Sequence, residues 1–404
     1  MAEQPAQPPA WRLWLSILGL AIPVYATITL SPLMNGAAID TLHINEFQIG
    51  LIRTCEVAIN AGLTIWLALR LGRMKPQQLG LIGGVLMLVG NMAVGFGDSV
   101  VTLIAGRLAA GAGAALMATA AGATIARMAS PHRVSASLAI PITICSVAAV
   151  TIGGRAVEAQ GLTGVGLVLS VLCVIGLALS LLAPRTAFAP AAHIPPLTHM
   201  VGLLRNPYVL GSALSFIGST AVWSFFERKG VSLGLSQSQI GDLIGLSSIA
   251  GGILGTLAIF ARDAQVRVAA VIAIIVFGIG HAAQALAPTV ALYAAGAFVT
   301  AATFSYIQSF TGAIGVRLDR TGGLNAAGNG WASFFNAFAP AIGGALIMTG
   351  SFAPIALLCI ACMIATTVLM WIAARNLPSA KLTDEEVAAS ARPATEPPEP
   401  VHAP

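Results

Sequence analysis

Long apolar segments alternate with short polar ones along almost the whole chain of 404 residues. A helix needs about 20 apolar residues to cross the roughly 30 Å hydrocarbon core of a bilayer. The chain lacks the segments of alternating apolar and polar residues, each about ten residues long, that a transmembrane barrel requires. The pattern therefore predicts an all-α polytopic membrane protein with twelve transmembrane helices, at 14–35, 48–69, 78–96, 101–126, 134–154, 162–183, 208–227, 238–260, 267–287, 290–315, 328–349 and 353–374.

The composition agrees with lipid as the surrounding solvent. Hydrophobic residues make up 57% of the chain and charged residues only 9%, whereas soluble domains carry about 25% charged residues. The first apolar segment lacks a convincing small-residue cleavage site, so we expect a retained span. The cysteines all lie in apolar segments without metal-ligand neighbours, which predicts packing residues without disulfides: Cys55, Cys145, Cys173, Cys359 and Cys362.

The distribution of Lys and Arg predicts the orientation in the membrane, because basic residues concentrate in cytoplasmic segments. Only Arg155, Arg228 and Lys229 fall in outer loops, and both termini are predicted to be cytoplasmic in a bacterial inner membrane. The net charge of +5 is scattered between apolar segments and does not indicate nucleic-acid binding. The predicted cytoplasmic basic residues are Arg12, Arg70, Arg73, Lys75, Arg127, Arg133, Arg185, Arg205, Arg262, Arg267, Arg317, Arg320, Arg375, Lys381 and Arg392.

The chain also repeats itself at a shift of about 190 residues. The segment Gln48-Ile49-Gly50 returns as Gln239-Ile240-Gly241, and Ile152-Gly153-Gly154 returns as Ile342-Gly343-Gly344. Two further matches are Ala105-Gly106 with Ala295-Gly296, and Gly122-Ala123 with Gly312-Ala313. Because the shift covers six predicted spans, an even number, the two halves have the same orientation in the membrane.

The repeat predicts two pseudo-symmetric six-helix bundles in a 6+6 parallel arrangement. The expected parts are a cytoplasmic N-terminal tail (1–11), a first bundle (12–183), a cytoplasmic linker (184–207), a second bundle (208–375) and a disordered cytoplasmic tail (376–404). The last part is rich in Pro, Ala and Glu and too polar to form a core.

Together with two motifs, this plan resembles the major facilitator superfamily over nearly all of residues 12–375. Arg107-x-x-x-Gly111-x-Gly113 is similar to the family's fourth-span motif, and Arg70-x-Gly72-Arg73 to its cytoplasmic loop motif, with Leu69 at the usual acidic position. Gly153-Gly154 is kept in the fifth span, but Ala149-Val150 stands where many antiporters carry Gly-Pro; Pro340 precedes Gly343-Gly344 in the eleventh. The resemblance implies transport by alternating access between the bundles, while the departures weaken assignment to any subfamily, particularly to the drug/proton antiporters.

The second predicted span carries the sharpest functional pattern. Arg53, Glu56 and Asn60, followed by Thr64, share one helical face. Because a charge at the centre of a span costs about 2.5 kcal/mol or more, this face should turn towards the central cavity. Arg107 in the fourth span lies at a comparable depth and is expected to complete an Arg53–Glu56–Arg107 network. The alternatives are that Arg53 and Glu56 form a purely structural pair and that Arg107 is architectural.

If Glu56 loses its arginine partners in one conformation, desolvation would favour its protonated form. We therefore take Glu56 as the candidate proton site, and Glu56→Gln should abolish gradient-driven uptake while leaving counterflow exchange.

Other polar and aromatic residues in the spans are candidates for the substrate pathway, and each could instead make a helix–helix hydrogen bond. In the seventh span, the alternative for Glu227 is a solvated helix end together with Arg228 and Lys229. Prolines, including Pro340, are candidates for bends where gates close. The remaining pathway candidates are Tyr25, Trp223, Tyr306, Gln308 and Asn336.

These features predict a secondary active transporter, with proton coupling, for a small organic solute. Two cavity-facing arginines would suit a carboxylated metabolite; the alternatives are efflux of amphipathic, drug-like compounds and a non-transporting sensor on the same fold. The sequence contains no nucleotide-binding loop, catalytic constellation or metal-binding cluster, so we expect neither an enzyme nor a cofactor or metal. The expected partners are a small-molecule substrate, protons and the lipid bilayer, and the expected state is a monomer.

Overall fold

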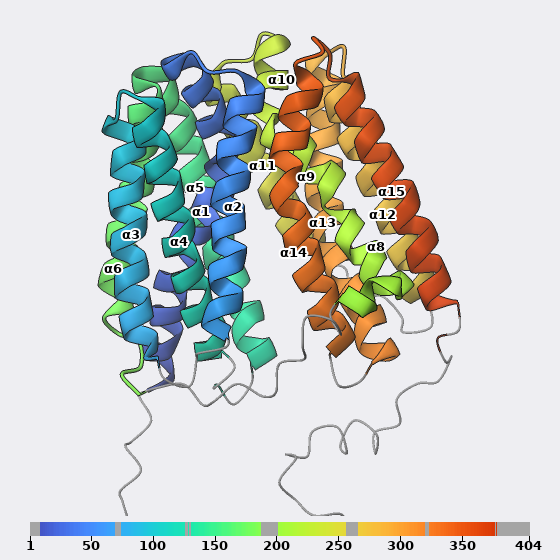
Figure 1. The fold of residues 1–404 in the computed structure, drawn as a ribbon, viewed down its shortest axis with the longest axis horizontal. Coiled ribbons are helices and arrows are strands. Elements are labelled where there is room, and N and C mark those ends of the chain that lie inside the picture. Colours follow the sequence, from blue (N-terminus) through green and yellow to red (C-terminus); the bar gives the residue numbers. More distant parts are fainter. Residues whose placement is uncertain are drawn as a thin grey trace, which may run out of the picture.

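The computed structural model describes residues 9–68, 74–125, 128, 131–186, 201–255, 266–319, 323–375 and 377. Within these ranges the chain is helical apart from short connections and contains no β-strand (Figure 1). The helices of the first half are α1 (Ala10–Leu42), α2 (Glu46–Ala68), α3 (Pro76–Phe96), α4 (Val100–Ile125), α5 (Pro131–Gln160) and α6 (Leu162–Ser180). Those of the second half are η2 (Leu203–Arg205), α8 (Pro207–Ser215), α9 (Ile217–Ser224), α10 (Phe226–Ser232), α11 (Gln237–Gly255), α12 (Val266–Leu286), α13 (Val290–Leu318), α14 (Gly323–Ile347) and α15 (Ala353–Ala374).

Nine of the described helices are long and apolar enough to cross a membrane, and the bent α8–α10 segment makes a possible tenth. The α2 and α11 helices fall outside this set, and both carry several polar side chains along their length. Each lies between helices of opposite halves: α2 contacts α4 and α14, and α11 contacts α5 and α13. Protein therefore replaces lipid along much of their surface, which explains why these two helices tolerate more polar residues.

The predicted span 208–227 is not one straight helix. It consists of α8, α9 and α10, with interruptions at Phe216 and Phe225 and a bend of 42° before α10. The hydroxyl of Ser215 donates to the Ser212 carbonyl oxygen at 2.7 Å, and that of Ser224 donates to the Thr220 carbonyl oxygen at 2.8 Å. Such bonds compete with the helical hydrogen bonds of the backbone and often bend helices, so a serine-rich span gives a broken helix here.

The internal repeat has a structural counterpart at the starts of α2 and α11. The Asn45 amide donates to the Gln48 side chain and the Gln48 amide donates back to the Asn45 side chain, both at 2.9 Å. Ser236 and Gln239 make the same reciprocal pair, 191 positions later. These capping boxes satisfy backbone amides that the first turn of a helix leaves free. The repeated glutamine thus defines where each helix begins.

Glycines repeat in the same way where neighbouring helices touch. Gly90 of α3 and Gly106 of α4 face each other so closely that a Cβ on Gly106 would lie 2.6 Å from the Gly90 carbonyl oxygen. Gly280 of α12 and Gly296 of α13, each 190 positions later, meet in the same manner, with 2.7 Å between a Cβ on Gly296 and the Gly280 carbonyl oxygen. In lipid, such close backbone approach is a main source of helix association.

Replacing Gly106 by Val should therefore push α3 and α4 apart and destabilise the first half by about 1–3 kcal/mol, the usual cost of overpacking. Gly122 on the same helix has nothing within 4 Å of a built Cβ, so Gly122→Val is the matched control. Thermal unfolding of the purified variants would measure the difference. Equal melting temperatures for the two variants would contradict the role of this contact.

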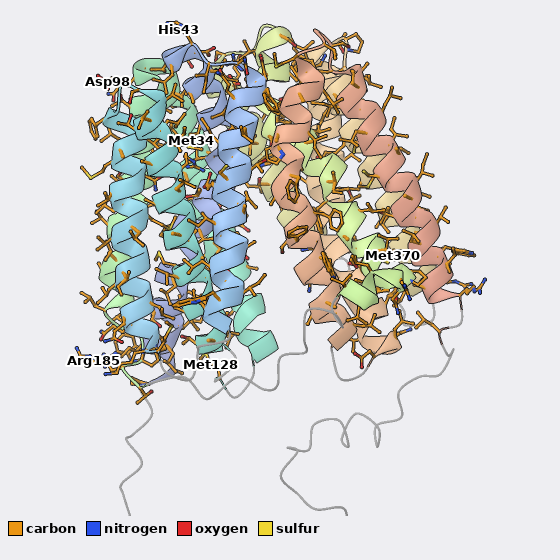
Figure 2. The ribbon with its side chains drawn as sticks, in the orientation of Figure 1. Met34, His43, Asp98, Met128, Arg185 and Met370 are labelled. Atoms are coloured by element: carbon orange, nitrogen blue, oxygen red, sulfur yellow. The ribbon has the colours of Figure 1, made fainter. Side chains whose placement is uncertain are left out.

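The two halves lie side by side and meet mainly through α2 with α14 and α5 with α11, with smaller contacts of α1 with α9, α10 and α11. In Figure 1 the ribbons of α2 and α14 approach each other at the end where α2 begins and lie apart at its other end. His43 and Asp98 mark the end where the halves meet, and Met128 and Arg185 mark the opposite end (Figure 2). The halves are therefore joined mainly at one end of the molecule.

Candidate functional site

The first candidate site is a charged network buried between α1, α2 and α4. Glu56 Oε2 pairs with both Arg53 and Arg107, and Arg107 Nε donates to it at 2.7 Å. Arg53, Glu56 and Arg107 are 9%, 3% and 1% exposed, so all three are buried. Arg107 Nη1 also contacts the Met34 sulfur at 3.0 Å, and Met34 lies in the half of the molecule near the joined end (Figure 2). One carboxylate therefore balances two guanidinium groups away from water.

The glycines of the fourth-span motif make this network possible. A Cβ on Gly111 would lie 2.6 Å from the Glu56 carbonyl oxygen and 2.9 Å from its Cγ. Gly113 faces the other way, towards Gly83 and Met87 of α3. Because both positions lack a side chain, α4 packs closely against α2 and α3 at once, and Arg107 reaches Glu56.

The polar stripe of α2 becomes more exposed along the helix. Arg53 and Glu56 are buried, Asn60 is half-buried, and Thr64 is exposed. The Asn60 side chain donates to the Gly111 carbonyl oxygen at 3.3 Å. Much of the stripe therefore contacts α4.

The second candidate site is a cavity of about 750 Å³ in the second half, to which α1 contributes Ile28. Its walls come from the helices α9 to α14, and its described lining includes Trp223, Gln308 and Asn336. Arg53, Glu56 and Arg107 are not among the described residues that line it. The expectation of a charged wall from the first half is thus not met in this cavity, where the lining is aromatic and polar.

Aromatic rings follow one another along this cavity. The Phe304 ring lies 6.3 Å from the rings of Phe216 and Phe277, measured between centroids, and the Phe277 ring lies 4.3 Å from that of His281. Trp223 donates its indole N–H to the Ile28 carbonyl oxygen at 3.4 Å and thereby ties α9 to α1. The cavity therefore offers flat apolar faces next to polar groups.

A smaller pocket of about 140 Å³ adjoins the cavity and shares four lining residues with it, Phe216, Gln308, Asn329 and Ala332. The rest of its lining is mostly hydroxyl and amide groups from α8, α13 and α14, including Ser212, Ser215, Thr311 and Asn325. The two spaces thus form an aromatic compartment with a polar side pocket.

Two other predicted pathway residues lie elsewhere. Tyr306 is not among the described lining residues, and its hydroxyl donates to the Leu254 carbonyl oxygen at 2.8 Å, which links α13 to α11. Tyr25 is 49% exposed and is likewise absent from the described lining. Tyr306 therefore makes the helix–helix hydrogen bond that is its alternative role, and Tyr25 does not line this cavity.

Glu227 is buried, which contradicts its alternative interpretation as part of a solvated helix end. A solvated helix end was one interpretation, but Glu227 is 0% exposed and packs against Gly36 of α1. Its carboxylate accepts hydrogen bonds from Arg228 at 2.7 and 2.8 Å and from Gln237. Arg228 in turn donates to both carboxylate oxygens of Asp40 on α1, at 2.8 and 2.7 Å. This cluster joins the two halves.

Repeated glycines close the joined end of the molecule in two equivalent places. A Cβ on Gly50 would collide with the Pro340 carbonyl group, and a Cβ on Gly241 would lie 2.6 Å from the Val150 carbonyl oxygen. Gly50 and Gly241 are 191 positions apart, and Val150 and Pro340 are 190 apart. The start of α2 therefore packs on α14, and the equivalent start of α11 packs on α5.

Equivalent glycine contacts between the two halves occur one helical turn further out. A Cβ on Gly154 would lie 2.6 Å from the Gln237 carbonyl oxygen, and one on Gly344 would strike the Glu46 backbone. An ion pair between Arg155 and Asp242, at 2.8 Å, accompanies the α5–α11 contact. In contrast, Gly153 faces Leu30 and Gly343 faces Ala221, so these two glycines pack within their own halves.

The cytoplasmic loop motif Arg70, Gly72 and Arg73 lies outside the described residues. Sequence reasoning also missed several functional candidates, namely Asp40, Gln237, Asp242, Phe216, Phe277 and Phe304. The repeat contained a signal for Gln237, because it occupies the position equivalent to Glu46. For the phenylalanines no such signal exists, since apolar residues are expected throughout a span.

No family model and no curated protein matches this sequence. Among the solved structures that are similar to it, two match over most of their length. The first is a bacterial homologue of the human lysosomal transporter Spinster in an inward-facing, unoccupied conformation, with a TM-score of 0.62, 14% identity, and 91% of this chain and 96% of that chain covered. The second is a mutant of the nucleoside transporter NupG, with a TM-score of 0.63, 14% identity, and coverage of 90% and 99%. At this identity the likeness concerns the fold.

Proposed function

Because the chain has the fold of the major facilitator superfamily, we propose that it is a secondary active transporter of a small organic solute that works by alternating access. The observation that carries this proposal is the cavity of about 750 Å³ in a molecule whose halves are joined at one end by pseudo-symmetric glycine contacts. Such contacts can open and close as a unit, which is what alternating access requires.

The proposed topology has twelve spans in two six-helix bundles. The nine membrane-length helices and the α8–α10 segment give ten, and α2 and α11, packed between helices of both halves, complete the number. Both termini are proposed to be cytoplasmic in a bacterial inner membrane. Two of the three basic residues assigned to the outside, Arg155 and Arg228, are ion-paired with carboxylates. They therefore add no unpaired positive charge to the outer side, which supports this orientation.

With this orientation the joined end is the outer one, and the conformation faces the cytoplasm. Reaching the outward-facing state would require separation of α2 from α14 and of α5 from α11, together with loss of the Arg155–Asp242 and Arg228–Asp40 ion pairs. We take the protein to act as a monomer surrounded by lipid.

Glu56 is the proposed proton site, because it is a buried carboxylate whose two partners come from different helices. Movement of α4 against α2 would remove Arg107 from Glu56 and favour protonation. Glu56→Gln in reconstituted vesicles should abolish uptake driven by a proton gradient and leave counterflow exchange in place. Retained counterflow would show that the variant is folded, and an unchanged dependence on the gradient would contradict the role.

The carboxylated metabolite expected from the sequence receives little support, because both guanidinium groups are engaged by Glu56 and neither lines the cavity. Efflux of an amphipathic compound is the alternative that the aromatic lining supports. The presence of polar groups in the cavity favours transport over a non-transporting sensor. The name of NupG, a nucleoside transporter, adds nucleosides as candidate solutes.

A further inference from the structure

We infer that the solute is uncharged and joins a flat ring to a group rich in hydroxyl or N–H donors. This inference rests on the proposed function, since it assigns the substrate class of the cavity in the second half. It is carried by three properties of the described lining: the absence of Asp, Glu, Lys and Arg, the row of aromatic rings, and five hydroxyl groups whose protons are already donated within their own helices.

Charge is the first property. The described lining of the cavity and of its side pocket contains no Asp, Glu, Lys or Arg. An ion held there would lose its hydration without meeting a counter-ion, which is costly inside a protein. A cation would gain from the aromatic faces but would find no carboxylate, and an anion would find no guanidinium group.

The second property is the row of rings formed by Phe216 at the break between α8 and α9, Phe304 of α13 and Phe277 of α12. Neighbouring rings in this row lie 6.3 Å apart between centroids and are inclined by 70° and 37° to one another. Phe304 lines the cavity and is 45% exposed. An aromatic ring gains both from covering such faces and from ring–ring contact.

The third property is the direction of the hydroxyl hydrogen bonds. Ser212 and Thr311 in the side pocket, and Ser247, Ser248 and Ser333 in the cavity, each donate their proton to a carbonyl oxygen of their own helix, at 2.6 to 3.0 Å. A hydroxyl has one proton and two lone pairs, so these groups can offer a solute only acceptors. Hydroxyl or N–H groups of a solute would satisfy them.

Amides complete the recognition. Gln308 and Asn329 line both the cavity and the side pocket, and their side-chain amides have no hydrogen-bond partner within the described part of the chain. An amide can donate and accept at once, which suits a group that does the same. Because both amides lie where the cavity meets the side pocket, we place the junction between the solute's ring and its hydroxylated group beside them.

The test uses four probes on the purified full-length protein: uridine and phenyl β-glucoside, which join a ring to hydroxyl groups, benzoate as an aromatic anion, and tetraphenylphosphonium as an aromatic cation. Ligand-induced thermal stabilisation measures binding, and uptake into proteoliposomes measures transport. We expect the first two probes to bind and the ions not to bind. Gln308→Ala should weaken binding by about tenfold, equivalent to about 1.4 kcal/mol. Gln77→Ala should leave affinity unchanged, because the Gln77 amide lies in the first turn of α3, in the other half, where it donates to the Leu181 carbonyl oxygen.

The outcomes separate this inference from the proposed function. Binding of benzoate or tetraphenylphosphonium in preference to both uncharged probes would overturn the inference and leave a transporter of another substrate class. Failure of both uncharged probes to bind at millimolar concentration would also overturn it. If an uncharged probe binds and Gln308→Ala weakens it, but vesicles neither accumulate nor exchange that probe, the substrate class stands as a ligand class and the proposed transport fails.

Discussion

Glu56→Gln is expected to lower the free energy of unfolding by about 3–5 kcal/mol, the usual cost of removing one partner from a buried ion pair. The reason is the charge count of the network, in which a single carboxylate is shared by Arg53 and Arg107. Without it, two guanidinium groups remain close together and buried, with no counter-ion among their described partners. Thermal or denaturant unfolding of the purified protein would measure the loss.

The arginine variants should behave differently. Arg107→Gln leaves the neutral Arg53–Glu56 pair, and Arg53→Gln leaves the Arg107–Glu56 pair, so each should cost less, about 1–3 kcal/mol for the lost charged hydrogen bonds. Combining Glu56→Gln with Arg107→Gln should restore part of the stability that Glu56→Gln alone removes, because one of the two unpaired charges is gone. Such a partial rescue is specific to a network with one shared carboxylate.

The exposed ion pair between Arg155 and Asp242 provides the control. Its side chains are 56% and 39% exposed, and exposed pairs contribute only about 0–1 kcal/mol. Arg155→Gln should therefore leave the unfolding midpoint nearly unchanged. Equal costs for all three single substitutions of the network, or additive costs in the double variant, would show that the charges are not balanced in this way.

The network also shows how far a sequence pattern reaches. The spacing of Arg53, Glu56 and Asn60 correctly placed them on one face of α2, and the depth of Arg107 correctly brought it to the same level. The spacing did not determine which neighbour that face would meet, because α2 lies between α4 and α14. The glycine at position 111 brings α4 close enough to contact much of the stripe, and a cavity wall was expected instead.

Glu227 illustrates a different limit. Three consecutive charged residues at the end of a predicted span are typical of a solvated helix end. The carboxylate is nevertheless buried, since Gly36 leaves room for it on α1 and since Arg228 and Gln237 satisfy it. Gly36 lies almost 200 positions away in the sequence, and only the approach of the two halves brings it into contact.

The repeat predicted more of the structure than any single motif. It identified equivalent positions, and these positions have equivalent surroundings: capping boxes at Gln48 and Gln239, and glycine contacts at Gly90 and Gly280. It did not reveal that Gly50 and Gly241 pack on the opposite half. Internal similarity relates two positions to each other, whereas a contact between halves depends on how the bundles are placed.

These reciprocal contacts between the halves lead to a second large expected effect, on transport. Gly50→Leu should prevent α2 from closing on Pro340 and Ala341 of α14, because a built Cβ at Gly50 already lies within 2.9 Å of the Pro340 carbonyl carbon. Destabilising the closed contact by about 3 kcal/mol would change the ratio of closed to open molecules by roughly 100-fold. Transport should then fall at least about tenfold, and Gly241→Leu, its equivalent against Val150, should have the same effect.

Gly62→Leu is the matched control, since Gly62 lies on the same helix and has nothing within 4 Å of a built Cβ. The state of the outer contact can be read separately by placing a cysteine at Asn336, which lines the cavity, in a background without the five native cysteines. A membrane-impermeant maleimide added outside should label this position faster in Gly50→Leu than in Gly62→Leu. Lost transport without increased labelling would mean that the leucine damages the fold, and normal transport in Gly50→Leu would mean that these glycines do not form the outer gate.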